Sequence, residues 1–231
     1  MTAQPEFILF GTAHSLTITL TLLIVILVPL LLKNLKFQNK IRVSMALATL
    51  LIINEIANMF ISTYIYGNPL IYSLPLHLCG MAALLTAWML YQHSYRAYEV
   101  AYFWAVGGSI PAMLTPDLIV GFPHFSFIKF FFAHGLIIMG VIYATIVFEF
   151  RPTLLSVAKA VGAAIVLMIF IALIDYLLDA NYMYLFEKPV QNTMMDFMGP
   201  WPWYILSLIV IGTLIMFLCY LPFIFIRNNK I

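Results

Sequence analysis

Charged residues are scarce in this sequence. Of 231 residues, 11 are Lys or Arg and 9 are Asp or Glu, together 9% of the chain, whereas 64% are hydrophobic and the mean hydropathy is +1.03. A soluble domain of this size has too small a core to bury so much apolar surface. The composition therefore excludes a soluble globular protein and predicts an integral membrane protein built as one helical domain over residues 1–231.

Cysteine is equally scarce, because the chain has only Cys79 and Cys219. The topology derived below places them near opposite faces of the membrane, which makes a disulfide between them geometrically unfavourable. Basic residues are missing before the first apolar run, and that run is longer than the apolar region of a signal peptide. We therefore do not expect a cleavable signal peptide.

What the chain has in abundance is apolar runs, each close to the roughly 20 residues that cross a bilayer as a helix. The predicted fold class is therefore all-α, a polytopic membrane bundle of about seven transmembrane helices. The predicted helices are Phe7–Leu32, Val43–Tyr64, Leu74–Tyr91, Val100–Leu114, Phe127–Phe148, Leu154–Leu178 and Trp203–Ile226. The fourth run contains Gly107, Gly108 and Pro111, which favour a kink or a break.

The distribution of basic residues predicts the orientation of the bundle. With an odd number of helices, one side carries Lys33, Lys36, Lys40, Arg42, Arg96, Arg151, Arg227 and Lys230. The opposite side keeps Lys188 and, near a helix end, Lys129. Because loops rich in Lys and Arg stay in the cytoplasm, the N-terminus is predicted outside and the C-terminus in the cytoplasm. The segment Gly199-Pro-Trp-Pro-Trp203 agrees, since Trp prefers the membrane interface.

Most ionisable and polar residues inside the apolar runs fall in the outer half of this predicted membrane. At about 1.5 Å per residue, His14 and His134 both lie about 10 Å below the outer ends of their helices. The residues that share the outer half are His14, Glu55, Asn58, His77, Cys79, His134 and Asp175. Such residues are costly in lipid and by default indicate a functional site. Only Lys159 is a clear charge in the inner half, where its long side chain can reach the interface.

Each of these residues also has a purely structural interpretation. A single His or Asn in a membrane helix often holds helices together by hydrogen bonds, which applies to His14, Asn54 and Asn58. A lone Cys79 is more often a small buried hydrophobe than a nucleophile. The convergence of several histidines and carboxylates at one depth is what favours chemistry.

A thiol near an imidazole is the composition used for covalent acyl transfer, in which the imidazole takes the thiol proton and a carboxylate orients it. We predict Cys79 as the nucleophile, His134 or His14 as the base, and Asp175 or Glu55 as the orienting carboxylate. At this depth the available ester is a phospholipid or a lipoprotein acyl chain. Membrane lipids are therefore the expected partners, with no nucleic acid and no cofactor.

Five further residues are expected to contact substrate, and the long loop after the sixth helix is expected to cap the site. They are Asn58, His77, Asp117, Asn181 and Tyr182. No metal site is predicted, because the chain has neither an HExxH motif nor a His pair at i, i+4. A retinal pigment is excluded, since the seventh run has no internal lysine. The remaining alternative is a transporter or ligand-binding membrane protein with an outward-facing polar pocket and no covalent chemistry.

Several motifs together resemble the YwaF-like family of bacterial multi-pass integral membrane proteins. They are Phe10-Gly-Thr-Ala-His14, Leu74-Pro-Leu-His-Leu-Cys-Gly80, Leu114-Thr-Pro-Asp117, Phe122-Pro-His-Phe125, His134-Gly135, Asp175-Tyr176, Asn181-Tyr182 and Gly199-Pro-Trp-Pro-Trp203. The resemblance covers essentially the whole chain and implies a bacterial plasma membrane location. The family is distantly similar to eukaryotic multi-pass proteins implicated in cysteine-dependent transfer of acyl chains to lysophospholipids. That similarity implies that Cys79 matches their nucleophile.

Overall fold

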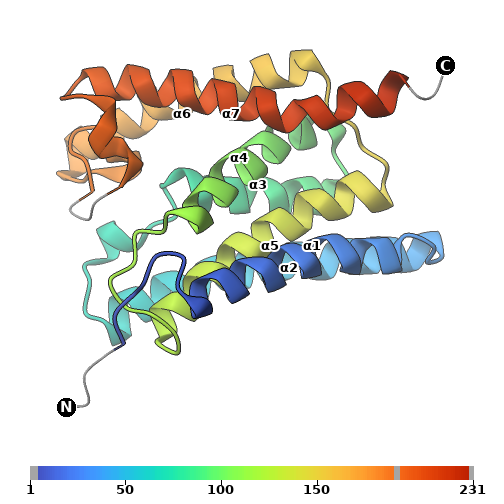
Figure 1. The fold of residues 1–231 in the computed structure, drawn as a ribbon, viewed down its shortest axis with the longest axis horizontal. Coiled ribbons are helices and arrows are strands. Elements are labelled where there is room, and N and C mark those ends of the chain that lie inside the picture. Colours follow the sequence, from blue (N-terminus) through green and yellow to red (C-terminus); the bar gives the residue numbers. More distant parts are fainter. Residues whose placement is uncertain (1–4, 190–192, 229–231) are drawn as a thin grey trace.

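The computed structural model describes residues 5–189 and 193–228, and within them the chain forms seven α-helices (Figure 1). Their bounds are α1 Thr12–Leu32, α2 Phe37–Phe60, α3 Leu78–Gln92, α4 Tyr95–Leu114, α5 Phe125–Val147, α6 Leu154–Leu178 and α7 Trp203–Asn228. Four short helical turns connect them: η1 Ile61–Ile65, η2 Leu70–Ser73, η3 Tyr182–Tyr184 and η4 Met194–Met198. The predicted all-α bundle of seven helices is confirmed.

Five of these helices, α1, α2, α5, α6 and α7, are long and apolar enough to cross a membrane. The other two are α3 and α4. Helix α3 has only 15 residues, and α4 carries Arg96, Glu99 and several tyrosines. Large apolar side chains on α1, α2, α6 and α7 are exposed, as expected of helices that face lipid. The protein is thus a multi-pass membrane protein in contact with lipid.

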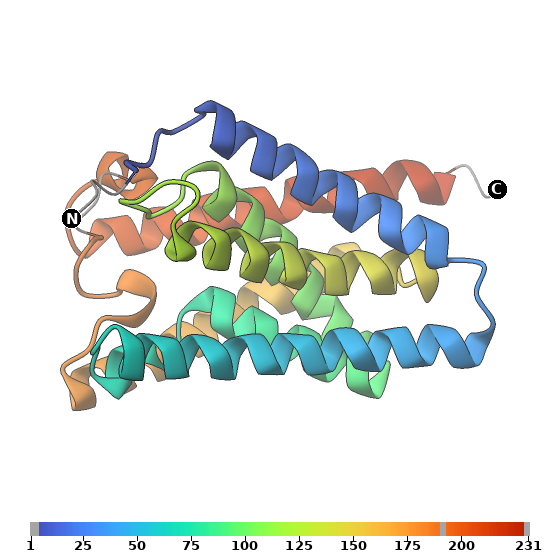
Figure 2. The same ribbon diagram turned by 90° about the horizontal axis from the view of Figure 1, so that it is seen from below.

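Helix α4 connects the two halves of the bundle, because it packs against α3 and α5 on one side and against α6 and α7 on the other. Helix α1 packs on α5, and α2 packs on α3 and α5 (Figures 1 and 2). Small residues allow these close approaches. A Cβ atom on Gly140 of α5 would lie 2.5 Å from Cγ2 of Thr86 on α3, and one on Gly135 would lie 2.8 Å from Cγ2 of Thr21 on α1.

The two ends of the chain lie at opposite ends of the bundle (Figure 2). We call the end that carries residues 5–11, 66–77, 115–124 and the α6–α7 loop the N-terminal face. There the chain before α1 pairs with the α4–α5 loop: the Phe7 N–H donates to Ile119 O (3.0 Å) and the Gly121 N–H donates to Pro5 O (2.7 Å). This pairing fixes the start of α1 against α4 and α5.

Five helices begin at different residues from those predicted: α1 starts at Thr12 and not Phe7, α5 starts at Phe125 and not Phe127, and α2, α3 and α4 also differ. Helix α2 starts at Phe37 and not Val43, so Lys40 and Arg42 lie in its first turns. Helix α4 starts at Tyr95, because the Ser94 side chain accepts a hydrogen bond from the Ala97 N–H and caps it. Helix α3 starts at Leu78, four residues later than predicted, and this difference shapes the site.

Candidate functional site

The start of α3 places Cys79 in the first turn of a helix at the N-terminal face. Pro75 lies in a tight turn before the helix, in which the Leu76 N–H donates to Leu74 O (2.8 Å). This turn passes so close to the first turn of α3 that a Cβ on Gly80 would lie 2.7 Å from Pro75 O. His77 is the residue at the N-cap and Cys79 is the second residue of the helix. Among residues 5–189 and 193–228, nothing accepts a hydrogen bond from the N–H groups of Leu78, Cys79 or Gly80. Free N–H groups at a helix start favour negative charge.

Side chains from two other elements surround Cys79. The Glu55 carboxylate of α2 and the Tyr184 hydroxyl of the α6–α7 loop both lie within electrostatic range of the thiol. The Tyr184 hydroxyl donates to Asp117 Oδ2 (3.2 Å). Tyr184 also packs on the imidazole of His77, with 5.5 Å between ring centroids. The structure thus brings together Cys79, His77, Asp117 and Glu55 of the predicted site, and adds Tyr184.

The α6–α7 loop covers this cluster, and several of the predicted residues hold it there. Asp175, at the end of α6 and 1% exposed, accepts a hydrogen bond at Oδ1 from the Tyr182 N–H (2.8 Å). His77 Nδ1 accepts from the Met183 N–H (3.2 Å), and Tyr182 lies edge-on to the same imidazole. From α7, the Tyr204 hydroxyl donates to Tyr184 O (2.7 Å). The predicted cap is therefore built on Asp175 and His77.

Asn181 immediately precedes Tyr182 in the same loop and organises the loop from within. Its Oδ1 accepts from the N–H groups of Phe186 and Glu187, and its Nδ2 donates to Glu187 O (2.9 Å). These contacts are all within the loop. Asn181 thus supports the shape of the cap.

His14 is bonded on both sides of its ring. Its Nδ1 accepts from the Phe10 N–H (2.9 Å), and its Nε2 lies 2.8 Å from Met113 O of α4. Since Nδ1 must be unprotonated to accept, Nε2 carries the proton and donates it. The ring, which is 1% exposed, also packs against Phe131 of α5. His14 joins α1 to α4 and α5 with no ring nitrogen left over.

His134 on α5 has the opposite arrangement. Its Nδ1 lies 2.8 Å from Phe130 O one turn earlier, and because a carbonyl only accepts, Nδ1 carries the proton. Its Nε2 is therefore an unprotonated acceptor, and in the described part of the chain no donor is bonded to it. His134 is buried.

Glu55 lies near the end of the membrane-length helix α2, five residues before Phe60, and is half-buried. Its nearest polar partner is Asn54, whose Nδ2 lies 3.4 Å from Glu55 Oε1. Asn58 was the neighbour expected from the three-residue spacing; it is half-buried one turn further along. Lys129 at the start of α5 lies within electrostatic range of Glu55. The carboxylate thus has a basic residue nearby that sequence reasoning had not connected with it.

Burial sets the protonation of the groups that lie in the loops. Burial lowers the pKa of His77, and the nearby Asp117 carboxylate opposes part of this effect. Burial raises the pKa of Tyr184 to about 12, with Asp117 and Cys79 adding to the shift. At neutral pH both are therefore uncharged, with His77 protonated on Nε2 and Tyr184 protonated on its hydroxyl. Both can act as hydrogen-bond donors.

No three His, Cys, Asp or Glu side chains of the described ranges gather in a way that holds a metal ion. Two contributors, Tyr184 and Asn54, were not among the residues predicted for the site. Tyr184 lies two residues after Tyr182 in a loop with no periodicity to indicate which side chain points inward. Asn54 adjoins Glu55 in sequence, and a helical wheel separates such neighbours by about 100°.

These features define a multi-pass membrane protein with a covered polar site around a cysteine at one face. The chain belongs to the TMEM164 family, whose sequence profile matches residues 9–220 and so includes every residue of this site. No curated protein and no solved structure matches the chain.

Proposed function

We propose that this protein is a membrane-embedded acyltransferase or transacylase that acts on lipid through Cys79. The observation that carries the proposal is the position of Cys79 in the first turn of α3, with unpaired N–H groups beside it and Glu55 and Tyr184 within electrostatic range. A thiol next to free backbone N–H groups has what acyl transfer needs: a nucleophile and donors for the oxyanion of the tetrahedral intermediate.

The reaction proceeds in two halves. A base takes the proton from Cys79 Sγ, and the sulfur attacks the ester carbonyl carbon of a donor phospholipid. The ester C–O bond breaks, the leaving lysolipid oxygen takes the proton from the base, and the acyl chain stays on Sγ as a thioester. An acceptor hydroxyl then gives its proton to the base and attacks the thioester carbon. The new ester leaves with the acyl chain, and the thiolate regains a proton.

His134 is the base in this proposal, and the hydrogen bonds explain why it is preferred to His14. A general base needs an unprotonated ring nitrogen that is free to accept. His14 uses both nitrogens in structural bonds, and His77 presents Nε2–H, a donor. Of the three, His134 carries its proton on Nδ1, which donates to Phe130 O, and its unprotonated Nε2 is free to accept a proton.

The other predicted residues divide between orientation and binding. Glu55 is the carboxylate placed to interact with the reacting groups, because it lies within electrostatic range of Cys79. Asp175 supports the covering loop. His77, Tyr184 and Asp117 bind the polar end of the lipid from the loop side. With the N-terminus outside, as the basic residues predict, the substrate comes from the outer leaflet of a bacterial plasma membrane.

The test is acyl transfer by the purified protein in vesicles, from a phospholipid with an isotope-labelled acyl chain to a lysophospholipid. Mass spectrometry of the intact protein reports a hydroxylamine-sensitive acyl adduct, as expected of a thioester on Cys79. Cys79→Ala should abolish transfer and adduct, whereas Cys219→Ala should keep both. His134→Ala should slow adduct formation about 100-fold, while His14→Ala should mainly lower the melting temperature. Unchanged transfer by a folded Cys79→Ala protein would overturn Cys79 as the nucleophile. Absence of transfer and of adduct in the natural protein would leave a ligand-binding or transport role, sensitive to Glu55→Gln in its place.

A further inference from the structure

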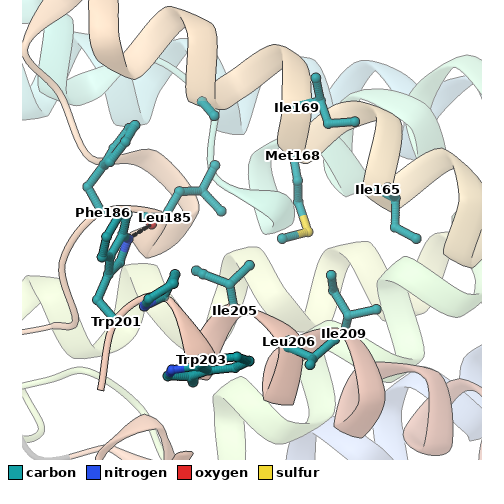
Figure 3. Close-up of a pocket in the computed structure, with 12 residues that line it drawn as sticks. Ile165, Met168, Ile169, Leu185, Phe186, Trp201, Trp203, Ile205, Leu206 and Ile209 are labelled. Carbon is teal, nitrogen blue, oxygen red and sulfur yellow. Dashed lines mark hydrogen bonds between the residues drawn. The ribbon is translucent and has the colours of Figure 1, made fainter. Parts of the chain in front are cut away.

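An apolar groove runs between α6 and α7, away from Cys79. It consists of two hollows of about 510 and 470 Å³ that share Ile165 of α6. The hollow next to the α6–α7 loop, here the Trp201 hollow, has walls from α6, α7 and the loop, as Figure 3 shows. Prominent among its lining residues are Met168, Ala172, Leu185, Phe186, Trp201 and Leu206.

The second hollow, here the Gly162 hollow, continues along the same helices toward the opposite face. It exists because small residues of α6, Ala158 and Gly162, lie where larger side chains would fill the space, with Thr213 of α7 among the other walls. A Cβ on Gly162 would meet no atom within 4 Å. The groove therefore extends over most of the membrane-spanning length of α6.

The shape and surroundings of the groove indicate its occupant. Helices α6 and α7 are both of membrane-spanning length and expose apolar side chains, so the groove opens toward lipid. The two helices also contact each other, and α4 packs against both of them from the interior, so the groove lies on their outer, lipid-facing side. Each hollow falls within the roughly 300–1,000 Å³ of small-ligand sites. A single flexible hydrocarbon chain fits both conditions.

The loop end of the groove supplies polar and cationic groups. Trp201 Nε1 donates to Leu185 O (3.2 Å), and this hydrogen bond fixes the wall of the hollow that the loop supplies (Figure 3). Lys188 Nζ lies 5.4 Å from the ring centroid of Tyr204, the residue between the groove residues Trp203 and Ile205. Neighbouring Glu187 is exposed. The ammonium of Lys188 is thus placed at the level where Trp residues meet the membrane interface, and it complements an anionic phosphate.

We propose that the α6–α7 groove is a binding site for one membrane phospholipid, with an acyl chain lying through both hollows and the phosphate at Lys188. The site is separate from Cys79 and stands on its own observations. It does share one wall with the cover of Cys79, because Leu185 packs in one cluster with Leu74 and Leu76 of the segment before α3. A lipid in the groove therefore touches the loop that covers the cysteine.

Photo-labelling of the full chain in vesicles tests the proposal. The probe is a phosphatidylcholine with a diazirine midway along one acyl chain, mixed into unlabelled phosphatidylcholine, and labelled peptides are identified by mass spectrometry. Label should concentrate on α6 and α7. Gly162→Phe, which fills the second hollow, should lower this labelling about tenfold, the effect of losing about 1.4 kcal/mol of binding. Gly212→Phe is the matched control, because Gly212 of α7 also has open space around it and lines neither hollow.

Ala172→Phe fills the Trp201 hollow and should also lower labelling, which keeps the test valid if Gly162→Phe does not fold. A second probe with an anionic phosphatidylglycerol headgroup tests Lys188: Lys188→Gln should weaken its labelling about fivefold, the contribution of one basic residue near an anionic headgroup. Even labelling of the exposed faces of α1, α2, α6 and α7 would overturn the proposal, since it indicates ordinary bilayer lipid. So would labelling unchanged in both groove variants, or cross-links between two copies across α6 and α7 in place of lipid label.

Discussion

His14, His77 and His134 differ in which ring nitrogen is bonded, and this difference determines what each can do. His14 is fully bonded and joins helices. His77 accepts from the Met183 N–H and holds the covering loop. His134 keeps an open acceptor nitrogen. Spacing along the chain predicted that histidines would share a depth, but a ring's tautomer depends on tertiary partners that spacing does not contain.

Acid should destabilise the fold through His77. Its pKa is lowered from the ordinary 6.5 by burial, so above that pH the ring is neutral in both the folded and unfolded states and has no effect. As pH falls below about 6.5 the unfolded chain takes up a proton and the folded one resists, so the free energy of unfolding decreases. The decrease ends below the folded-state pKa.

His77→Asn tests this effect, because the Asn side-chain oxygen can accept from Met183 as Nδ1 does but cannot be protonated in this range. The variant should show a shallower loss of melting temperature between neutral pH and pH 5 than the natural protein. His93, whose pKa burial also lowers, is present in both and cancels in the comparison. Equal slopes would mean that His77 is not the group responsible.

Gly80→Ala should destabilise the start of α3. Its Cβ would lie 2.7 Å from Pro75 O and 2.8 Å from Pro75 Cα, and these are backbone atoms that cannot rotate away. The expected cost is about 1–3 kcal/mol of unfolding free energy, typical of overpacking. Thermal unfolding in detergent measures it, with Gly162→Ala as the control because open space surrounds that glycine. Similar melting temperatures for the two variants would show that the turn at Pro75 shifts to make room for the added Cβ.

At the scale of elements, α4 and α6 are held together by an ion pair far from the cysteine. Glu99 of α4, 4% exposed, receives hydrogen bonds from Lys159 Nζ (2.6 and 2.8 Å) and from the Ser156 hydroxyl (2.7 Å), both on α6. Sequence analysis expected Lys159 to extend to the interface alone. Two residues sixty positions apart show no relation in a local pattern, so the pair had to come from the packing.

Replacing Lys159 alone should therefore lower the free energy of unfolding more than replacing both Lys159 and Glu99. Lys159→Met leaves the Glu99 carboxylate without its hydrogen-bonded counter-charge, with Arg96 acting only electrostatically, and should cost about 1–3 kcal/mol of unfolding free energy. In Glu99→Gln with Lys159→Met the uncharged amide oxygen can still accept from Ser156, so the double variant should melt at a higher temperature than Lys159→Met alone. Simple additivity of the two substitutions would show that the ion pair contributes no coupling.

The helices themselves were largely predictable, because each lipid-facing run is long and continuously apolar. The exceptions were ends set by contacts that hydropathy does not record. Helix α3 begins late because Pro75 and its neighbours cross its first turn, and α4 begins early because Ser94 caps it. The sequence was enough to predict the depth of the site in the membrane and the residue types in it. The position of Tyr184 depends on how the α6–α7 loop folds, which the sequence pattern does not indicate.

For the whole molecule, the basic residues predict which face is cytoplasmic. The face opposite the site carries Lys33 and Arg151, among others, so the positive-inside rule places the site outside. In a background of Cys79→Ala and Cys219→Ala, Glu187→Cys should react with a membrane-impermeant thiol reagent in intact cells, and Gln38→Cys should not. Both positions are exposed, so access to solvent is matched. The reverse pattern would move the site to the cytoplasmic leaflet.

The shortness of α3 has a consequence for the bilayer around the protein. At about 1.5 Å per residue its 15 residues span about 22 Å, short of the roughly 30 Å of hydrocarbon. If its far end lies at one interface, Cys79 lies about 8 Å inside the other, deeper than the ester groups of undisturbed lipids. Thinning of the membrane beside α3 would close that gap at a modest energetic cost. We therefore expect acyl transfer to be faster in vesicles of short-chain than of long-chain lipids, and a rate independent of chain length would argue against thinning.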